Sequence, residues 1–269
     1  MIICCGEALI DFVPTKDKNT YLPLPGGSIF NIAIGLGRMG VLTGFLSRLS
    51  TDFFGTLLQN HLVENHVDLR YCPRVEGQTT LAFVNIKYQH NHEEPQYTFY
   101  AEGAVDRDMT TEDLPAHLPK EVTTLHFGSI SLVLEPGASA FEALMHREKD
   151  QRIITLDPNV RPIVIRNWEA YRTRFESWLP CVDILRLSEV DLELLYPNVG
   201  LQELLPNWFE QGVKLMILTR GINGSIACLP DGVKVIVPSK IVKIKDTVGA
   251  GDTFFSAVLT HLYENGYLS

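Results

Sequence analysis

The stretch "DTVGAGDTF", residues 246–254, combines residue types that suit phosphate chemistry. Gly249, Ala250 and Gly251 carry little or no side chain, and they stand directly before an apolar, helix-like run. N–H groups at the start of a helix attract anions, and small side chains let a phosphate reach them. Asp252 follows at once, and its carboxylate could accept a proton from a hydroxyl that attacks phosphorus. The alternative is that Gly251 bends the chain and Asp252 only caps the helix.

Three further stretches carry polar residues that could bind a polyol or an anion. In "PGGSIFN", Gly26 and Gly27 enter a helix whose first turn holds Asn31, although a plain tight turn is a rival interpretation. "GEALID" ends an apolar strand at Asp11, which could bind sugar hydroxyls or be solvated. "DPNVRP" places Arg161 just beyond a strand, where open α/β sheets bind ligands. A guanidinium there could bind phosphate or form a surface ion pair.

The elements that must position these residues alternate between strand-like and helix-like patterns, which predicts an α/β fold around a largely parallel sheet. We expect strands at 2–5, 43–49, 124–132, 152–159, 183–188 and 214–221. We expect helices at 28–39, 52–66, 137–149, 168–179, 189–196, 201–211 and 252–265, and a hairpin over 225–238. Pro206 should end or kink the helix at 201–211, because proline lacks a backbone N–H.

One segment breaks this alternation. Residues 79–88 and 95–103 are two β-rich runs joined by a polar turn, with no helix between them. They predict an antiparallel hairpin outside the main sheet. Together with residues near 11–25, this segment of about 79–103 would form a small lid. No repeat or low-complexity linker is found, so we expect a single domain over residues 1–269.

The composition excludes several classes of protein. A net charge of −9 argues against a general nucleic-acid or anionic-membrane surface. No apolar run approaches the roughly 18–20 residues of a membrane span, and the N-terminus has no features of a signal peptide. The five cysteines contain no C-x-x-C pair, which argues against a disulfide framework and a structural zinc. We therefore expect a cytoplasmic protein that binds neither nucleic acid nor membrane.

Taken in order, the four polar stretches resemble motifs of the ribokinase-like (PfkB-type) carbohydrate kinases, and the resemblance covers essentially the whole chain. "DTVGAGDTF" is similar to the family's C-terminal motif, and "GGSIFNIAIGLGRMG" is similar to its N-terminal glycine motif. Within the family, "GEALIDFVP", "DPNVRP" and "FYAEGAVDR" look most like fructokinases. The resemblance implies an α/β sandwich with a mostly parallel sheet, a small β-sheet lid that can also pair subunits into a homodimer, and ATP-dependent phosphorylation of a sugar hydroxymethyl group.

The resemblance also implies roles for individual residues. Asp252 matches the catalytic base, and Gly249, Ala250 and Gly251 match an anion hole for the transferring phosphoryl group. The sugar site is matched by Asp11, Gly26, Gly27 and Asn31, and Arg161 would lie near the sugar or the phosphate. The segment that binds nucleotide phosphates is matched by Thr219, Gly221 and Gly224. Asp246 and the Val248 carbonyl match part of a monovalent-cation site for K⁺. Mg²⁺ should arrive bound to ATP, keeping several waters and few protein ligands.

This chain departs from the family pattern at three places. The usual K-x-N-x-x-E appears as "RLSEVD", with Arg186, Ser188 and Asp191 in those positions. Ser188 and Asp191 could still order magnesium-bound water beside the nucleotide. Ala101 stands in the lid where many relatives carry arginine. The chain stops at Ser269, where relatives continue with helices that wall the adenine, so we expect either a missing tail or a nucleotide pocket open on one side.

The leading hypothesis is a fructokinase that transfers the γ-phosphate of ATP to fructose, at O6. A second hypothesis is another ribokinase-like kinase, acting on 2-keto-3-deoxygluconate, ribose or a nucleoside. A third, from a different class, is a non-catalytic sugar sensor on the same scaffold. The presence of Asp252 with its glycine loop disfavours the sensor, because a sensor could lose the base without consequence.

Overall fold

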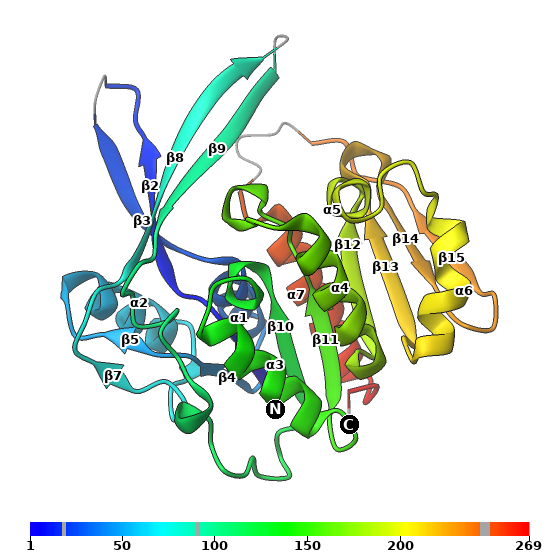
Figure 1. Cartoon of the computed structure of the whole chain (residues 1–269), viewed down its shortest axis with the longest axis horizontal. Helices are drawn as coiled ribbons and strands as arrows, with labels where there is room; N and C mark the ends of the chain where they lie inside the picture. The colour runs from blue at the N-terminus through cyan, green and yellow to red at the C-terminus, as the bar shows by residue number, and fades with distance from the viewer. Residues whose placement is uncertain (18–19, 90–91, 243–247, 269) are drawn as a thin grey trace.

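The computed structural model describes residues 1–17, 20–89, 92–242 and 248–268. The described residues form a large sheet with helices on both faces (Figure 1). Its strands are β1 (Ile2–Cys5), β4 (Thr43–Leu46), β6 (Val67–Asp68), β10 (Thr124–Gly128), β11 (Ile153–Asp157), β12 (Ile184–Ser188), β13 (Leu215–Thr219), β14 (Ser225–Cys228) and β15 (Lys234–Val237). The spatial order is β15-β14-β13-β12-β11-β10-β1-β4-β6. Pairing is parallel from β13 to β6, and β14 and β15 add an antiparallel edge.

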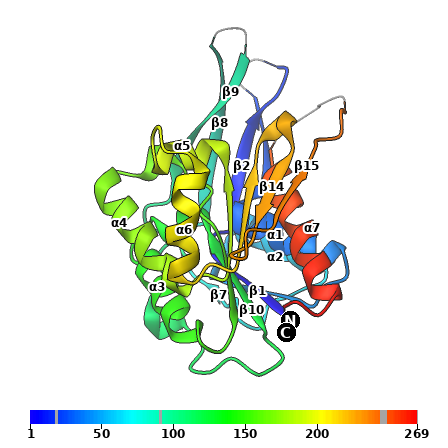
Figure 2. The ribbon, with the colours of Figure 1, turned by 90° about the vertical axis from the view of Figure 1, so that its right-hand side faces the viewer.

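Neighbouring residues of a buried strand face opposite helical layers, because side chains alternate across a strand. Ile3 and Cys5 of β1 pack into one core and Ile2 and Cys4 into the other. A strand buried on both faces has no polar position, which explains the run "IICC". Figure 2 shows the two layers on either side of the sheet. One layer holds α3 (Gly137–Glu148), α4 (Trp168–Trp178), α5 (Glu189–Leu195) and α6 (Leu201–Gln211), and the other holds α1 (Ser28–Arg38), α2 (Phe53–Glu64) and α7 (Ala250–Glu264).

A second sheet stands apart from the first and rises beyond the carboxyl ends of its parallel strands (Figure 1). Its strands are β2 (Leu9–Pro14), β3 (Tyr21–Gly26), β8 (Thr80–Gln89) and β9 (His92–Tyr100), in the order β3-β2-β8-β9. The pairing of β2 with β8 is parallel, and the other two pairings are antiparallel. We refer to this four-stranded sheet as the lid. The predicted fold class, an α/β sandwich with a mostly parallel central sheet and a smaller sheet, is confirmed.

Two predicted strands end three or four residues earlier than the sequence indicated. The strand expected at 124–132 ends at Gly128, and Ser129–Leu132 form a 3-10 helix. Ser129 has a φ of 57°, which turns the chain out of the sheet. The strand expected at 43–49 ends at Leu46, and a separate strand β5 (Leu49–Ser50) pairs with β7 (Arg74–Val75). Further 3-10 turns lie at Thr111–Asp113, Pro162–Val164, Leu179–Cys181 and Gly221–Asn223.

Pro206 does not end its helix, since α6 continues to Gln211. The carbonyl that loses its partner belongs to Gln202, four residues earlier, and this residue is exposed to water. Leu205 and Trp208 are buried on the opposite side and hold the helix against the core. Packing therefore outweighs the lost hydrogen bond here.

The cysteines Cys4, Cys5, Cys72, Cys181 and Cys228 are all buried free thiols. Within the described ranges, none of the helices is both long enough and apolar enough to cross a bilayer.

Candidate active site

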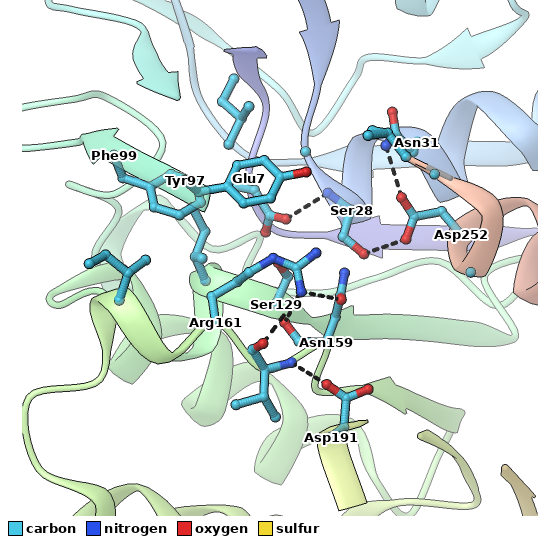
Figure 3. Close-up of a pocket in the computed structure, with 18 of the residues that line it drawn as sticks. Glu7, Ser28, Asn31, Tyr97, Phe99, Ser129, Asn159, Arg161, Asp191 and Asp252 are labelled. Carbon is cyan, nitrogen blue, oxygen red and sulfur yellow. Dashed lines mark hydrogen bonds between the residues drawn. The ribbon is translucent and has the colours of Figure 1, made fainter. Parts of the chain in front are cut away.

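A cavity of about 1030 Å³ lies between the lid and the carboxyl ends of the parallel strands. Loops that follow four of these strands reach it, which is where open α/β sheets bind ligands. Its polar lining includes Glu7 after β1, Ser129 after β10, Asn159 after β11 and Ser188 at the end of β12. Lid residues cover it from above, and the start of α7 closes one side (Figure 3).

Most of the residues that the sequence singled out lie in this cavity, and some do not. The lining includes Asp11, Gly27, Asn31, Arg161, Ser188, Asp191, Val248, Gly249, Gly251 and Asp252. Gly26 and Ala250 are chain neighbours of lining residues without lining the cavity themselves. Thr219, Gly221 and Gly224 also stand outside its lining. Asp246 lies outside the described residues.

Asp252 lies in the first turn of α7 and is 7% exposed. Its Oδ1 accepts a hydrogen bond from Ser28 Oγ at 2.8 Å, and its Oδ2 accepts one from Asn31 Nδ2 at 2.8 Å (Figure 3). Burial raises the pKa of this carboxyl, while the two hydrogen bonds and the charges of Arg161 and Arg186 oppose the rise. The carboxylate is therefore held in one orientation at the wall of the cavity.

The turn before Asp252 depends on two glycines for different reasons. Gly249 has a φ of 72°, a conformation that residues with a Cβ rarely adopt, and it is the residue from which α7 begins. At Gly251 a Cβ would lie 2.8 Å from Arg186 Nη2, so the guanidinium fills the space that a side chain would need. The glycines thus bring the first amides of α7 to the cavity wall above a buried cation.

Arg186 is almost fully buried and belongs to a polar network below this turn. Its Nη1 donates to Asp157 Oδ2 at 2.7 Å, and its Nη2 donates to Thr219 Oγ1 at 2.6 Å. Burial raises the pKa of Asp157 to about 6, although the Arg186 charge acts in the opposite direction. Thr219, which the sequence assigned to a nucleotide segment, holds Arg186 in this structure.

Asp11 lines the cavity on the lid side. Burial raises the pKa of its carboxyl to about 6, although the charge of Arg161 acts in the opposite direction. A Cβ at Gly26 would overlap the Asp11 carboxylate, so the adjacent strand needs glycine there. Arg161 Nη1 donates to Asn159 Oδ1 at 2.7 Å, and its guanidinium lies 5.7 Å from the centre of the Tyr97 ring. The Arg161 guanidinium and the Asp11 carboxylate therefore line the same cavity.

Sequence reasoning did not assign a role to Glu7, which lines the cavity and is 3% exposed. Its Oε1 accepts the backbone N–H groups of Ser28, at 2.9 Å, and Ile29, at 3.4 Å, at the start of α1. Burial raises the pKa of Glu7 to about 7. The only signal in the sequence was an acid directly after the first buried strand, in "GEALID".

Ser188 and Asp191 form a capping box at the start of α5. Asp191 Oδ2 accepts Ser188 N at 2.9 Å and Ser188 Oγ at 2.5 Å, while its Oδ1 accepts Val160 N at 2.7 Å. Oδ1 keeps one further lone pair, so this carboxylate can still accept one hydrogen bond from a ligand or a water. Among the described residues, no three His, Cys, Asp or Glu side chains are arranged to hold a metal directly.

Gly221 begins the 3-10 turn after β13 and Gly224 follows its last residue, with φ values of 52° and 81°. A Cβ at Gly224 would overlap the Val237 carbonyl, so this glycine permits a close approach of two strands. A Cβ at Gly221 would have no neighbouring atom within 4 Å, and the turn is exposed.

This chain resembles known proteins over its whole length. Residues 1–269 match the profile of the pfkB family carbohydrate kinases. A fructokinase from Rhizobium leguminosarum bv. trifolii is 38% identical over 272 residues, which cover 100% of this chain and 82% of that protein. Probable fructokinase-2 from Arabidopsis thaliana is 31% identical, over 98% of this chain and 82% of that protein.

Solved structures show the same fold. A fructokinase from Xylella fastidiosa with bound ATP has a TM-score of 0.89 at 25% identity, over 98% of this chain and 81% of that one. A fructokinase from Vibrio cholerae O395 with fructose, ADP and calcium bound has a TM-score of 0.85 at 26% identity, over 97% and 83%. This chain therefore belongs to the pfkB family of carbohydrate kinases.

Proposed function

We propose that this carbohydrate kinase is a fructokinase, which transfers the γ-phosphoryl group of ATP to O6 of fructose. One observation carries the proposal: a buried, oriented carboxylate, Asp252, stands at the amide end of α7 in a cavity that it shares with Asp11 and Arg161. A base, an anion-binding helix start and polyol-binding groups in one cavity are the parts that phosphoryl transfer to a sugar requires. The similarity to fructokinases supports this choice of sugar.

In this proposal Asp252 takes the proton of the attacking hydroxyl. The sugar oxygen forms a bond to the γ-phosphorus as the bond from that phosphorus to the bridging oxygen breaks, and ADP leaves with the bonding electrons. The backbone N–H groups at Gly249, Ala250 and Gly251 stabilise the charge on the transferring group, because they lack partners inside the helix. The low exposure of Asp252 favours this role, since burial raises its pKa and so its affinity for a proton.

The sugar contacts of the proposal come from the lid side and from α1. Asp11 would accept hydrogen bonds from sugar hydroxyls, and Gly26 and Gly27 would let the sugar approach the backbone. Asn31 donates its amide to Asp252, which leaves its Oδ1 to accept from a hydroxyl. Arg161 would lie near the sugar or the incoming phosphate.

The nucleotide assignments rest on the family resemblance. Thr219, Gly221, Gly224 and Ser188 would lie along the ATP phosphates. Magnesium bound to ATP would neutralise phosphate charge, with Asp191 reaching it through water. Asp246 and the Val248 carbonyl would contribute to a K⁺ site.

We also propose that the chain acts as a single domain with the lid as its movable cover, and that the lid pairs two copies into a homodimer. The lid's outer face supports this, because it carries an aromatic cluster with Tyr21 44% exposed and Tyr100 61% exposed. Exposed aromatic side chains beside a sheet edge are typical of surfaces that pair with another chain.

A coupled assay of ADP release, with Mg-ATP and potassium, tests the function over a panel of fructose, ribose, 2-keto-3-deoxygluconate and nucleosides. We expect turnover with fructose at a kcat/KM at least about tenfold above that of the other sugars. Preference for another sugar would replace fructokinase by a different kinase of the family. Binding of sugars without any turnover would favour a sensor.

A further inference from the structure

The Asp252 carboxylate is held by two side chains that come from a different helix. Ser28 Oγ and Asn31 Nδ2 belong to the first turn of α1, three residues apart, and therefore face the same way. They donate to the two different oxygens of the carboxylate, each at 2.8 Å. Rotation of the carboxylate would break both bonds at a position that is 7% exposed. Its orientation is therefore set from α1.

Ser28 is itself held from both sides. Its backbone N–H donates to Glu7 Oε1 at 2.9 Å, and its hydroxyl donates to Asp252 Oδ1. A serine hydroxyl has a single hydrogen, so the bond to Asp252 uses the whole donor capacity of the side chain. Gly27 allows the close approach of Glu7: its φ is 105°, and a Cβ there would lie 3.1 Å from the Glu7 carbonyl oxygen.

We propose that Ser28 is a positioning residue for Asp252, anchored by Glu7, and that its hydroxyl keeps the carboxylate ionised and aimed at the cavity. The inference rests on the proposed role of Asp252 as the base. A hydroxyl that donates to a carboxylate stabilises the charged form, so its loss makes the carboxylate bind a proton more readily. Ser28 thus sets the lower end of the pH range in which the base is available.

Other charged groups near Asp252 also affect the pH range in which this carboxylate is ionised. Arg161 and Arg186 favour its ionised form, while Asp11 and Asp157 repel it. Glu7 also lines the cavity, on the far side of Ser28. None of these charges is altered by replacing Ser28 with alanine, so the variant isolates the hydroxyl.

The test compares pH profiles of kcat/KM for wild type and Ser28→Ala with the sugar that the panel identifies. We expect the acidic limb to move upward by roughly one pH unit, the size of one hydrogen bond to a charged group. We expect kcat above the limb to fall about tenfold, because the base is less well oriented, and the sugar Kd to change less than about twofold. Ser256→Ala is the matched control, since Ser256 Oγ donates to the backbone carbonyl of Asp252 and not to its carboxylate. Its acidic limb should not move.

An unshifted limb in Ser28→Ala, or an equal shift in Ser256→Ala, would overturn the inference. A ¹³C NMR titration of the aspartate carboxyls, with the Asp252 signal assigned by its loss in Asp252→Asn, reads the same shift without turnover. Inactivity of the wild type toward every sugar would therefore remove the proposed function, while the titration would still decide whether Ser28 controls Asp252.

Discussion

Asp252 combines two opposed influences on one side chain. Burial raises its pKa, and two hydrogen bonds and two nearby guanidinium groups lower it. The result is a carboxylate that is shielded from water and held in one orientation, as the proposed base would need to be. A helix cap would need no donors from a second helix, which favours the catalytic interpretation over the capping one.

The first prediction concerns this residue. Asp252→Ala should lower kcat by about 10²–10⁴, because the general base is lost. The sugar Kd should change little, since the proposed sugar contacts come from other residues, among them Asp11 and Asn31. Stopped-flow or steady-state assays give kcat, and calorimetry gives the sugar Kd. A large rise in sugar Kd at unchanged kcat would assign Asp252 to binding instead.

Glu7 should make the stability of the protein depend on pH near neutrality. Its pKa is about 7 in the folded protein against an ordinary value of 4.5, so the unfolded chain releases the proton first as pH rises. The free energy of unfolding should therefore decrease from about pH 4.5 to about pH 7, by up to about 3 kcal/mol from this group. Glu7→Gln stays neutral and can still accept from Ser28. It should gain stability relative to wild type as pH rises from 5 to 8.

Urea unfolding at a series of pH values measures this difference. Glu210→Gln, an exposed residue of α6, is the matched control and should follow the wild-type curve. A constant difference between Glu7→Gln and wild type across this range would mean that Glu7 is ionised in the folded protein throughout.

At the scale of elements, the site depends on the meeting of two helix starts. α1 and α7 approach closely, because Gly35 of α1 leaves room for Ser256 of α7, where a Cβ would overlap the serine hydroxyl. Ser28 and Asn31 in the first turn of α1 bond to Asp252 in the first turn of α7, so the positive ends of both helices lie at the same corner of the cavity. This field stabilises the charge of the Asp252 carboxylate and, in the proposed reaction, that of the phosphoryl group.

The fit of α7 over Arg186 gives the third prediction. In Gly251→Ala the new Cβ would stand 2.8 Å from Arg186 Nη2, and the guanidinium is fixed by Asp157 and Thr219. Either the buried ion pair or the start of α7 must shift. We expect kcat to fall about 10–100-fold, since small displacements of reacting groups have effects of this size. Kinetics together with thermal unfolding measure the two consequences.

Gly200→Ala provides the control for this substitution. Gly200 precedes α6 and is not among the residues that line the cavity, and its φ of −73° is suitable for alanine. Its activity should match wild type. A Gly251→Ala enzyme with full activity would show that the tight packing above Arg186 has no bearing on the transfer.

At the scale of the whole molecule, local patterns were sufficient for the fold class. The apolar run of β1, the stripe of α1 and the β-rich hairpin at 79–103 each carry their signal within a few residues. The motifs around Asn31, Arg161 and Asp252 also indicated which loops carry polar groups, and these three residues lie in one cavity.

The contacts within the site could not be predicted in the same way. Ser28 and Asp252 are 224 residues apart, and their hydrogen bond depends on how closely α1 packs on α7. Glu7 is not part of a repeating pattern in the sequence, and its hydrogen bond to the Ser28 N–H depends on the turn at Gly27. Thr219 matched a nucleotide motif, yet its hydroxyl holds Arg186, because that buried cation requires a second acceptor. Such contacts join residues that are distant in the sequence, so they can be identified only once the helices and strands are packed together.

The proposed dimer gives the last prediction, at the level of the assembly. Tyr100 is 61% exposed on the outer face of the lid, where Phe83 lies at 5.6 Å between ring centres. If two lids pair through this face, Tyr100→Lys places a charge in the interface and should raise the dimer dissociation constant about 30-fold or more. Leu42→Lys, at a residue 67% exposed near the opposite end of the main sheet, should leave it unchanged. Sedimentation velocity over a range of concentrations measures both. A monomeric wild type, or a Tyr100→Lys protein as dimeric as wild type, would contradict the proposal that two lids pair through this aromatic face.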